Sequence, residues 1–170
     1  MPHATVITGA DGPCVQLARV VAASPESLWD MVTRRELLAN WFPCDVVIEG
    51  DQWVRGASIS FSFPADVADM TLAGEVLEAQ RPHRLAFTWG EETLRFEIDV
   101  EESATRLTLT DCLAAPYAAR NAAGWEVCLD RLCGAEVAPE AWRAHFDAYR
   151  EAFEPQLGPQ EGPPDTDAGG

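Results

Sequence analysis

The segment that decides the fold runs from Gly74 to Gly90 and reads GEVLEAQRPHRLAFTWG. Residues 85–89 of this segment, LAFTW, alternate large apolar and smaller side chains, which is the period of a β-strand with one buried face. Pro82 stands where the alternation breaks, and it favours a turn because proline has no backbone N–H to donate to a sheet. We therefore expect two antiparallel strands joined by a tight turn.

The same alternation extends the sheet in both directions along the chain. A first strand is expected from Val15 to Val21, where every second residue faces one side. The turns between the later segments are short and rich in Gly, Pro, Asp and Glu, which favours an antiparallel meander. Six further strands are expected at residues 44–49, 57–63, 70–80, 83–89, 92–101 and 105–111.

Helical patterns occur before and after this meander. Ser24-Pro25-Glu26 predicts a helix start, because serine caps a helix, proline suits its first position and an acid favours its positive end. Thr33 and Glu36 have the spacing of a capping box, which predicts a second short helix. Beyond Pro116 two apolar stripes have helical spacing, one formed by Trp125, Cys128, Leu129 and Leu132 and one by Trp142, Phe146, Tyr149 and Phe153.

The length of 170 residues fits one domain. Residues 1–13 show no periodicity and predict a loose N-terminal segment, so the domain is expected at residues 14–153. Residues 154–170 are acidic and rich in proline and glycine, which predicts a disordered tail. The start lacks the pattern of a secretory signal and no apolar run is long enough for a membrane span, so we expect a cytoplasmic protein without membrane insertion.

The charge of the chain excludes several classes of function. The net charge is −16, from 28 acidic and 12 basic residues, and all the basic residues are arginine. A phosphate backbone requires a clustered basic face, so no nucleic-acid partner is expected. The absence of lysine excludes a Schiff-base mechanism and a P-loop lysine. The acidity is expected to serve solubility.

No motif predicts catalysis, a metal site or a cofactor. The three histidines are far apart in the chain, and no nucleophile motif or glycine-rich nucleotide loop occurs. The acid pairs Glu91-Glu92 and Glu101-Glu102 are expected to be solvated ends of one strand. The odd number of cysteines and the lack of a signal sequence predict that all five thiols are reduced, namely Cys14, Cys44, Cys112, Cys128 and Cys133.

The order of these elements resembles the START/Bet v 1-like (SRPBCC) superfamily, and within it the Hsp90-ATPase-activator-homologue-like group. The resemblance implies an α+β helix-grip fold, in which a curved seven-stranded antiparallel sheet surrounds a C-terminal helix and two short helices follow the first strand. This chain differs from many relatives at Arg55-Gly56, where they have Gly-Gly, and at Ala122-Ala123, where they often have a histidine. The matching pieces are Ser24-Pro25-Glu26 with Leu28-Trp29, residues 37–41, Gly74-Glu75-Val76, Pro82 with residues 85–89, residues 106–110, and Gly124-Trp125 with Leu129.

A curved sheet closed by one helix favours an apolar cavity between them, although packing of a solid core alone would explain each single aromatic residue. Arg19 interrupts an apolar strand face, and it either reaches the rim as a structural residue or binds an anionic group of a ligand. The candidate ligand-binding residues are Arg19, Trp41, Phe61, Phe63, Phe87, Trp89, Phe96, Trp125 and Leu129.

Three functions follow from this interpretation. The first is binding of a small hydrophobic or aromatic molecule without catalysis. The second is an enzyme of the polyketide cyclase/aromatase kind, which the absence of an acid–base cluster disfavours. The third is a chaperone-linked interaction module, which the resemblance implies. This third function is disfavoured because the activators also carry a large N-terminal domain, for which this chain has no room. A homodimer or a protein partner is left open.

Overall fold

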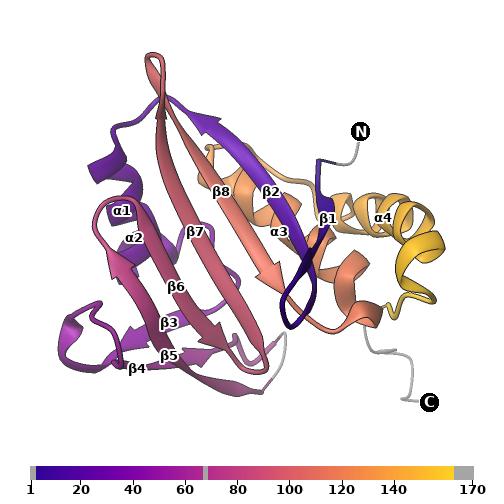
Figure 1. Cartoon of the computed structure of the whole chain (residues 1–170), viewed down its shortest axis with the longest axis horizontal. Helices are drawn as coiled ribbons and strands as arrows, with labels where there is room; N and C mark the ends of the chain where they lie inside the picture. Colours follow the sequence, from indigo (N-terminus) through magenta and orange to yellow (C-terminus); the bar gives the residue numbers. More distant parts are fainter. Residues whose placement is uncertain (1–2, 67–68, 163–170) are drawn as a thin grey trace.

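The strands of this computed structural model, which describes residues 3–66 and 69–162, form one curved antiparallel sheet (Figure 1). The strand order is β1-β2-β8-β7-β6-β5-β4-β3. The helix-grip prediction is confirmed, with eight strands in the described residues in place of the expected seven. Their bounds are β1 Thr5–Gly9, β2 Gly12–Val21, β3 Asp45–Ile48, β4 Ser58–Ser62, β5 Thr71–Gln80, β6 Arg84–Trp89, β7 Glu92–Glu101 and β8 Ala104–Cys112.

Alternation along the strands determines which face of the sheet is buried. In β7, Leu94, Phe96 and Ile98 are buried while the residues between them are partly exposed. Phe96 lies opposite Leu109 of β8 and Leu85 of β6, so the buried side chains of neighbouring strands form one continuous apolar surface.

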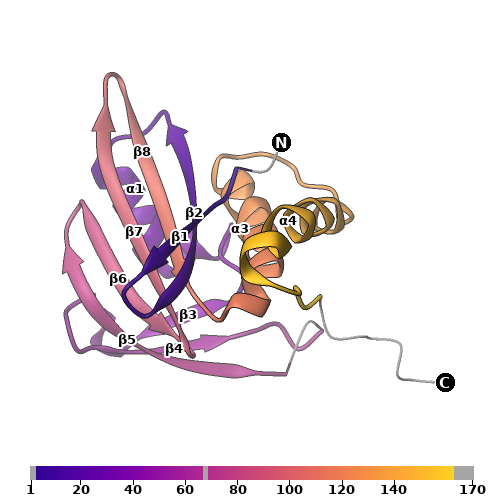
Figure 2. The ribbon, with the colours of Figure 1, turned by 45° about the vertical axis from the view of Figure 1, so that its right-hand side comes forward.

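The helices cover this apolar surface. The α-helices are α1 Pro25–Thr33, α2 Arg35–Leu38, α3 Ala118–Leu132 and α4 Ala141–Leu157, and two short 3-10 turns are η1 Glu49–Asp51 and η2 Ala115–Tyr117. Figure 2 shows α3 beside the sheet and α4 on the far side of α3. Within the described residues two α-helices follow the sheet, and α3 packs against β2. No helix in the described part of the chain is long and apolar enough to cross a membrane.

The predicted start of α1 is confirmed, and the predicted capping box of α2 is wrong. The Ser24 hydroxyl accepts a hydrogen bond from the Ser27 backbone N–H at 3.1 Å, which satisfies one free donor of the first turn. The Thr33 hydroxyl instead donates to the carbonyl of Trp29 at 2.6 Å, because Thr33 is the last residue of α1. Arg34 precedes α2 and offers no side-chain cap.

The N-terminal segment is not loose from residue 5 onward. β1 pairs with β2, and Gly9 lies opposite Gly12 across a two-residue turn. The glycines that suggested an irregular lead-in are the ends of a hairpin turn, where the φ of Gly12 is 129°. Residues 1–2 lie outside the described residues.

The expected disordered tail is also corrected for residues 154–162. α4 continues through Pro155 to Leu157, and the chain then returns to the start of α3. The Gln160 side chain accepts from the Ala119 N–H at 2.9 Å and donates to the Ala115 carbonyl at 3.0 Å. Gln160 therefore satisfies the Ala119 N–H, one of the backbone donors that a helix start leaves without a partner. The remainder of the predicted tail, residues 163–170, lies outside the described residues.

The expectation of five free thiols is wrong, because a disulfide joins Cys14 of β2 to Cys112 of β8. These residues are 98 positions apart but lie opposite each other in the sheet. Cys44, Cys128 and Cys133 are free. Thiol titration of the denatured, unreduced protein should therefore return about three groups. A result of five would contradict the disulfide and favour a reducing compartment, because disulfides persist in oxidising ones.

Gly74 allows β5 to approach β6 closely. A Cβ atom at this position would lie 2.1 Å from the Thr88 carbonyl oxygen and 2.7 Å from Cε2 of Phe61. Because both neighbours belong to strands, Gly74→Ala should lower the free energy of unfolding in urea by about 2 kcal/mol. Gly124→Ala is the control, since its Cβ would meet only Trp142 Nε1 at 4.0 Å and alanine favours a helix. Equal losses in both variants would contradict this prediction.

Candidate functional site

Most of the predicted lining residues pack against one another in the core. The rings of Phe61 and Phe87 have centroids 5.7 Å apart, those of Phe87 and Phe96 are 5.9 Å apart, and those of Trp41 and Phe96 are 6.1 Å apart. Leu129 is buried beside this cluster on the inner face of α3. These five residues therefore fill the space between the sheet and the helices, where the sequence had suggested a cavity.

Arg19 lies between the sheet and α3, where its guanidinium group is held by two carboxylates. It donates to Glu126 at 2.5 Å and to Asp130 at 3.1 Å, and it also contacts the backbone carbonyl of Ala18 at 3.0 Å. Burial lowers the pKa of Arg19, but the hydrogen bonds and the charges of the two acids outweigh it and raise the pKa. Arg19 thus joins β2 to α3, and both of its terminal nitrogens donate within the protein.

The other three predicted residues border open space at the end of the sheet near the start of α3. Phe63 and Trp89 line a cavity of about 510 Å³, which we call the Trp89 hollow. Trp125 borders an adjoining cavity of about 110 Å³ that shares Trp89 with the first. The Trp89 hollow is bordered by Phe63, Met70, Leu72, Trp89, Gly90, Glu91, Glu92, Ala114, Tyr117, Arg120 and Asn121.

The lining comes from parts of the chain that the fold brings together. Trp89 ends β6 and lies opposite Glu92 at the start of β7. Phe63 follows β4, and its ring centroid lies 6.0 Å from that of Trp89. Arg120 and Asn121 belong to the first turn of α3. The hollow therefore has an aromatic wall from the sheet and a polar wall from the helix and β7.

A pair of acids lies at the polar wall. The Asn121 side-chain amide donates to both carboxylate oxygens of Glu92, at 2.9 and 3.0 Å, and lies 3.1 Å from Oδ2 of Asp111. The Trp125 indole N–H donates to the same Asp111 oxygen at 2.8 Å. Asp111 is fully buried, whereas Glu92 borders the hollow. The two carboxyl groups are therefore joined through one amide.

The carboxyl groups of Glu92 and Asp111 do not both ionise easily, because two neighbouring negative charges repel each other. Burial, followed by the charge of Asp111, raises the pKa of Glu92 to about 8. Burial also raises the pKa of Asp111, although hydrogen bonds from Trp125 and Asn121 oppose that rise. Since these donors favour a charged Asp111, the proton of the pair resides on Glu92. Asp111 Oδ1, which no N–H reaches within the described residues, is the natural acceptor for that proton.

Arg120 is a cation at the same wall that is not in an ion pair. Its guanidinium carbon lies 4.2 Å from the centroid of the Tyr117 ring. Arg120 borders both the Trp89 hollow and the adjoining cavity. None of the ion pairs in the described part of the chain includes Arg120. This cation–π contact uses the face of the guanidinium group and no N–H donor, so the donors are available to a ligand.

The sequence did not reveal this polar wall. Glu92 was expected to be solvated at a hairpin end, but it is half-buried, and only Glu91 is exposed. One signal was available, because Asp111 follows Leu107 and Leu109 on a buried strand face where an apolar residue is the rule. Nothing in the local pattern around Arg120 distinguished it from a surface arginine.

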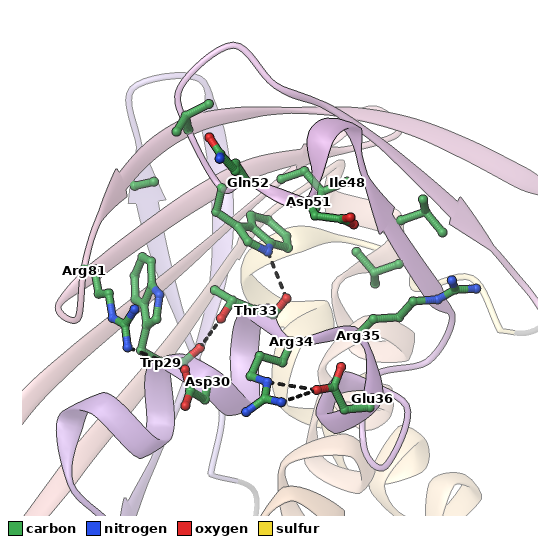
Figure 3. A pocket seen from close by; sticks show the side chains of 15 residues that line it. Trp29, Asp30, Thr33, Arg34, Arg35, Glu36, Ile48, Asp51, Gln52 and Arg81 are labelled. Carbon is green, nitrogen blue, oxygen red and sulfur yellow. Dashed lines mark hydrogen bonds and ion pairs between the residues drawn. The ribbon is translucent and has the colours of Figure 1, made fainter.

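A larger cavity of about 670 Å³ lies elsewhere, between α1, α2 and the segment after β3 (Figure 3). Two ion pairs lie among its lining residues, Arg34 with Glu36 at 2.5 Å and Arg81 with Asp30 at 3.8 Å. The Trp53 indole N–H donates to the carbonyl of Thr33 at 2.9 Å. None of the predicted ligand-binding residues borders this cavity.

Comparisons with known proteins give a family. The sequence model of the family described as "Activator of Hsp90 ATPase homolog 1-like protein" matches residues 22–135, which run from the end of β2 to just beyond α3. A search of curated proteins finds no significant match.

Several solved structures share the fold. Protein EF2215 from Enterococcus faecalis, described as a conserved protein of unknown function, has a TM-score of 0.73 at 21% identity and covers 89% of this chain and 91% of its own. CalU16 from Micromonospora echinospora has a TM-score of 0.69 at 19% identity, and the match covers 91% of this chain and 95% of CalU16. DynU16, from the dynemicin biosynthetic locus, has a TM-score of 0.60 at 25% identity, with 71% of this chain and 46% of DynU16 covered.

Proposed function

This chain belongs to the Activator of Hsp90 ATPase homolog 1-like family, and from that premise we propose that it binds a small hydrophobic or aromatic molecule in the Trp89 hollow. The observation that carries the proposal is the lining of this 510 Å³ space, which is aromatic on the side of the sheet and polar on the side of α3. Sites for small molecules commonly have this size and combine apolar walls with a few polar groups.

The aromatic wall supports a flat, apolar ligand. Phe63 and Trp89 present rings to the hollow, and Met70 and Leu72 extend the apolar surface. Met70 is 45% exposed in the absence of a ligand, so covering its side chain would remove apolar surface from water. A bound aromatic compound would gain about 25 cal/mol for each Å² of apolar surface that it covers.

Filling the hollow should abolish binding. Ala114 is exposed and borders the hollow, so a phenylalanine there occupies ligand space without entering the core. We expect the fluorescence of the uncharged probe N-phenyl-1-naphthylamine to rise on binding to the wild type, and Ala114→Phe to weaken that binding by about tenfold or more. The matched control is Ala138→Phe, which is exposed and does not border the hollow. Absence of probe binding to the wild type, or equal binding by both variants, would refute the proposal.

A cyclase-like enzyme is the second candidate, and the Glu92–Asp111 pair favours it. Paired carboxyl groups that share one proton can donate and accept protons near neutral pH. DynU16, which has the same fold, comes from a biosynthetic locus. Native mass spectrometry of the purified protein, followed by identification of the released compound, distinguishes a retained ligand from a converted one. A chaperone-linked role rests on the family description alone.

A further inference from the structure

The geometry points to Arg120 as the residue that binds an oxygen atom of the ligand, and we infer that the hollow takes an uncharged aromatic carbonyl compound such as an aryl ketone. This inference rests on the proposed function, because it names the ligand class for the same site. The Trp89 hollow would hold the ring system, and the guanidinium group would hold the carbonyl oxygen.

Arg120 differs from most arginines of this chain. Arg19, Arg35, Arg84 and Arg106, for example, all contact carboxylates. Arg120 is half-buried, its guanidinium carbon lies over the ring of Tyr117, and the residue borders both the Trp89 hollow and the adjoining cavity. A guanidinium group has five N–H donors and no acceptor, so its natural partner here is an oxygen supplied by the ligand.

The surrounding charges favour an uncharged oxygen over an anionic one. Glu91 borders the hollow, and the charged Asp111 lies directly behind Glu92. A carboxylate or phenolate ligand would approach both of these charges, in a chain whose net charge is −16. A ketone accepts hydrogen bonds from Arg120 without that repulsion, and its aromatic part suits Phe63 and Trp89.

Glu92 controls whether Arg120 is free. The charged or titratable groups around Glu92 are Asp111 on β8, Arg120 on α3, Tyr117 in η2 and the neighbouring Glu91. While Glu92 holds its proton, it does not attract Arg120 strongly. Its pKa of about 8 means that it ionises in mildly alkaline solution, where its carboxylate competes with the ligand for the guanidinium group.

The test compares two ligands of similar size that differ in one oxygen. 2-Acetylnaphthalene has a carbonyl group and 2-ethylnaphthalene does not, and each is used to displace N-phenyl-1-naphthylamine from the protein. At pH 6.5 we expect the wild type to prefer the ketone by about tenfold, which is the effect of one hydrogen bond to a charged donor. At pH 9.5 the preference should fall to about twofold or less. Ethylnaphthalene should bind equally at both pH values.

Three variants identify the groups involved. Arg120→Met should remove the preference for the ketone at both pH values while retaining the binding of ethylnaphthalene. Glu92→Gln, which resembles the protonated acid, should keep the preference at pH 9.5. Arg143→Met, an exposed arginine on α4, is the control and should behave as the wild type.

The two proposals fail in different ways. If neither naphthalene displaces the probe and the probe itself does not bind, the proposed function is wrong. If both compounds bind equally at pH 6.5, or if Arg120→Met keeps the preference, only the inference about Arg120 is wrong. A preference that persists in the wild type at pH 9.5 would overturn the role given to Glu92.

Discussion

Replacing Glu126 by glutamine is expected to lower the free energy of unfolding by about 3 kcal/mol, because it removes the charge from a buried ion pair. Glu126 lies on α3 with its side chain 1% exposed. It accepts hydrogen bonds from the His3 backbone N–H at 3.0 Å, from Arg19 at 2.5 Å and from the hydroxyl of Tyr149. One carboxylate therefore joins the N-terminal segment, β2 and α4 to the central helix.

The effect of pH on this group follows from its partners. Burial alone would raise the pKa of Glu126, but hydrogen bonds from Tyr149, His3 and Arg19 hold it below the ordinary value of 4.5. A lowered pKa stabilises the folded state above that ordinary value, and the stabilisation is lost as the pH falls through the folded-state pKa. The difference between wild type and Glu126→Gln should thus be fully present at pH 6 and shrink below pH 4.

Asp130→Asn is the matched control, because Asp130 contacts the same guanidinium group of Arg19 at 3.1 Å but is 37% exposed. An exposed partner contributes little, so we expect a loss below about 1 kcal/mol. Urea unfolding followed by circular dichroism measures both variants. If Asp130→Asn is as destabilising as Glu126→Gln, or if the Glu126 effect does not change with pH, the network does not join the elements as described.

Prediction from sequence succeeded where the pattern is local. The strand β7 begins at Glu92 and ends at Glu101 as the alternation predicted, and Ser24 caps α1 as its neighbours indicated. Both results depend on contacts between residues that are near in the chain. Periodicity reports which face of an element is buried, and the short turns between the segments indicate that consecutive strands pair.

It failed where residues distant in the chain determine the outcome. Cys14 and Cys112 face each other only because β2 and β8 are neighbours in a particular register. Arg19 was placed correctly on an inward face, but its partners Glu126 and Asp130 are more than 100 positions away. Alternation cannot name a partner on another element, so it could not distinguish a structural arginine from a ligand-binding one.

The same limit applies to the cavity. The aromatic residues were correctly expected to face inward, yet inward orientation does not distinguish a filled core from an open space. Phe61 and Phe87 fill the centre, whereas Trp89, on the same strand as Phe87 and two residues further on, reaches the hollow at the end of the sheet. Position along the strand relative to α3 decides the difference, and that position is a property of the assembled fold.

Replacing Glu92 by glutamine is expected to stabilise the protein at pH 9 by on the order of 3 kcal/mol, with little effect at pH 5. The pKa of Glu92 rises from an ordinary value of 4.5 to about 8 through burial and the nearby charge of Asp111. Between these two pH values the unfolded chain has lost the proton while the folded protein keeps it. Stability contributed by this site therefore decreases as the pH rises from 4.5 and levels off above 8.

Glutamine has no proton to lose, so the variant should lack this decrease while keeping an amide in contact with Asn121. The expected gain of about 3 kcal/mol is less than the free energy that corresponds to the whole pKa shift of Glu92, because solvent in the hollow screens part of the repulsion between the two carboxylates. Urea unfolding at pH 5, 7 and 9 measures the effect, and Glu91→Gln is the control, since Glu91 is exposed beside it. Two results would show that Glu92 and Asp111 do not share a proton: a wild type that is equally stable at pH 5 and pH 9, or a Glu91→Gln variant that gains as much stability as Glu92→Gln. Either result would also contradict the role of Glu92 in keeping Arg120 free.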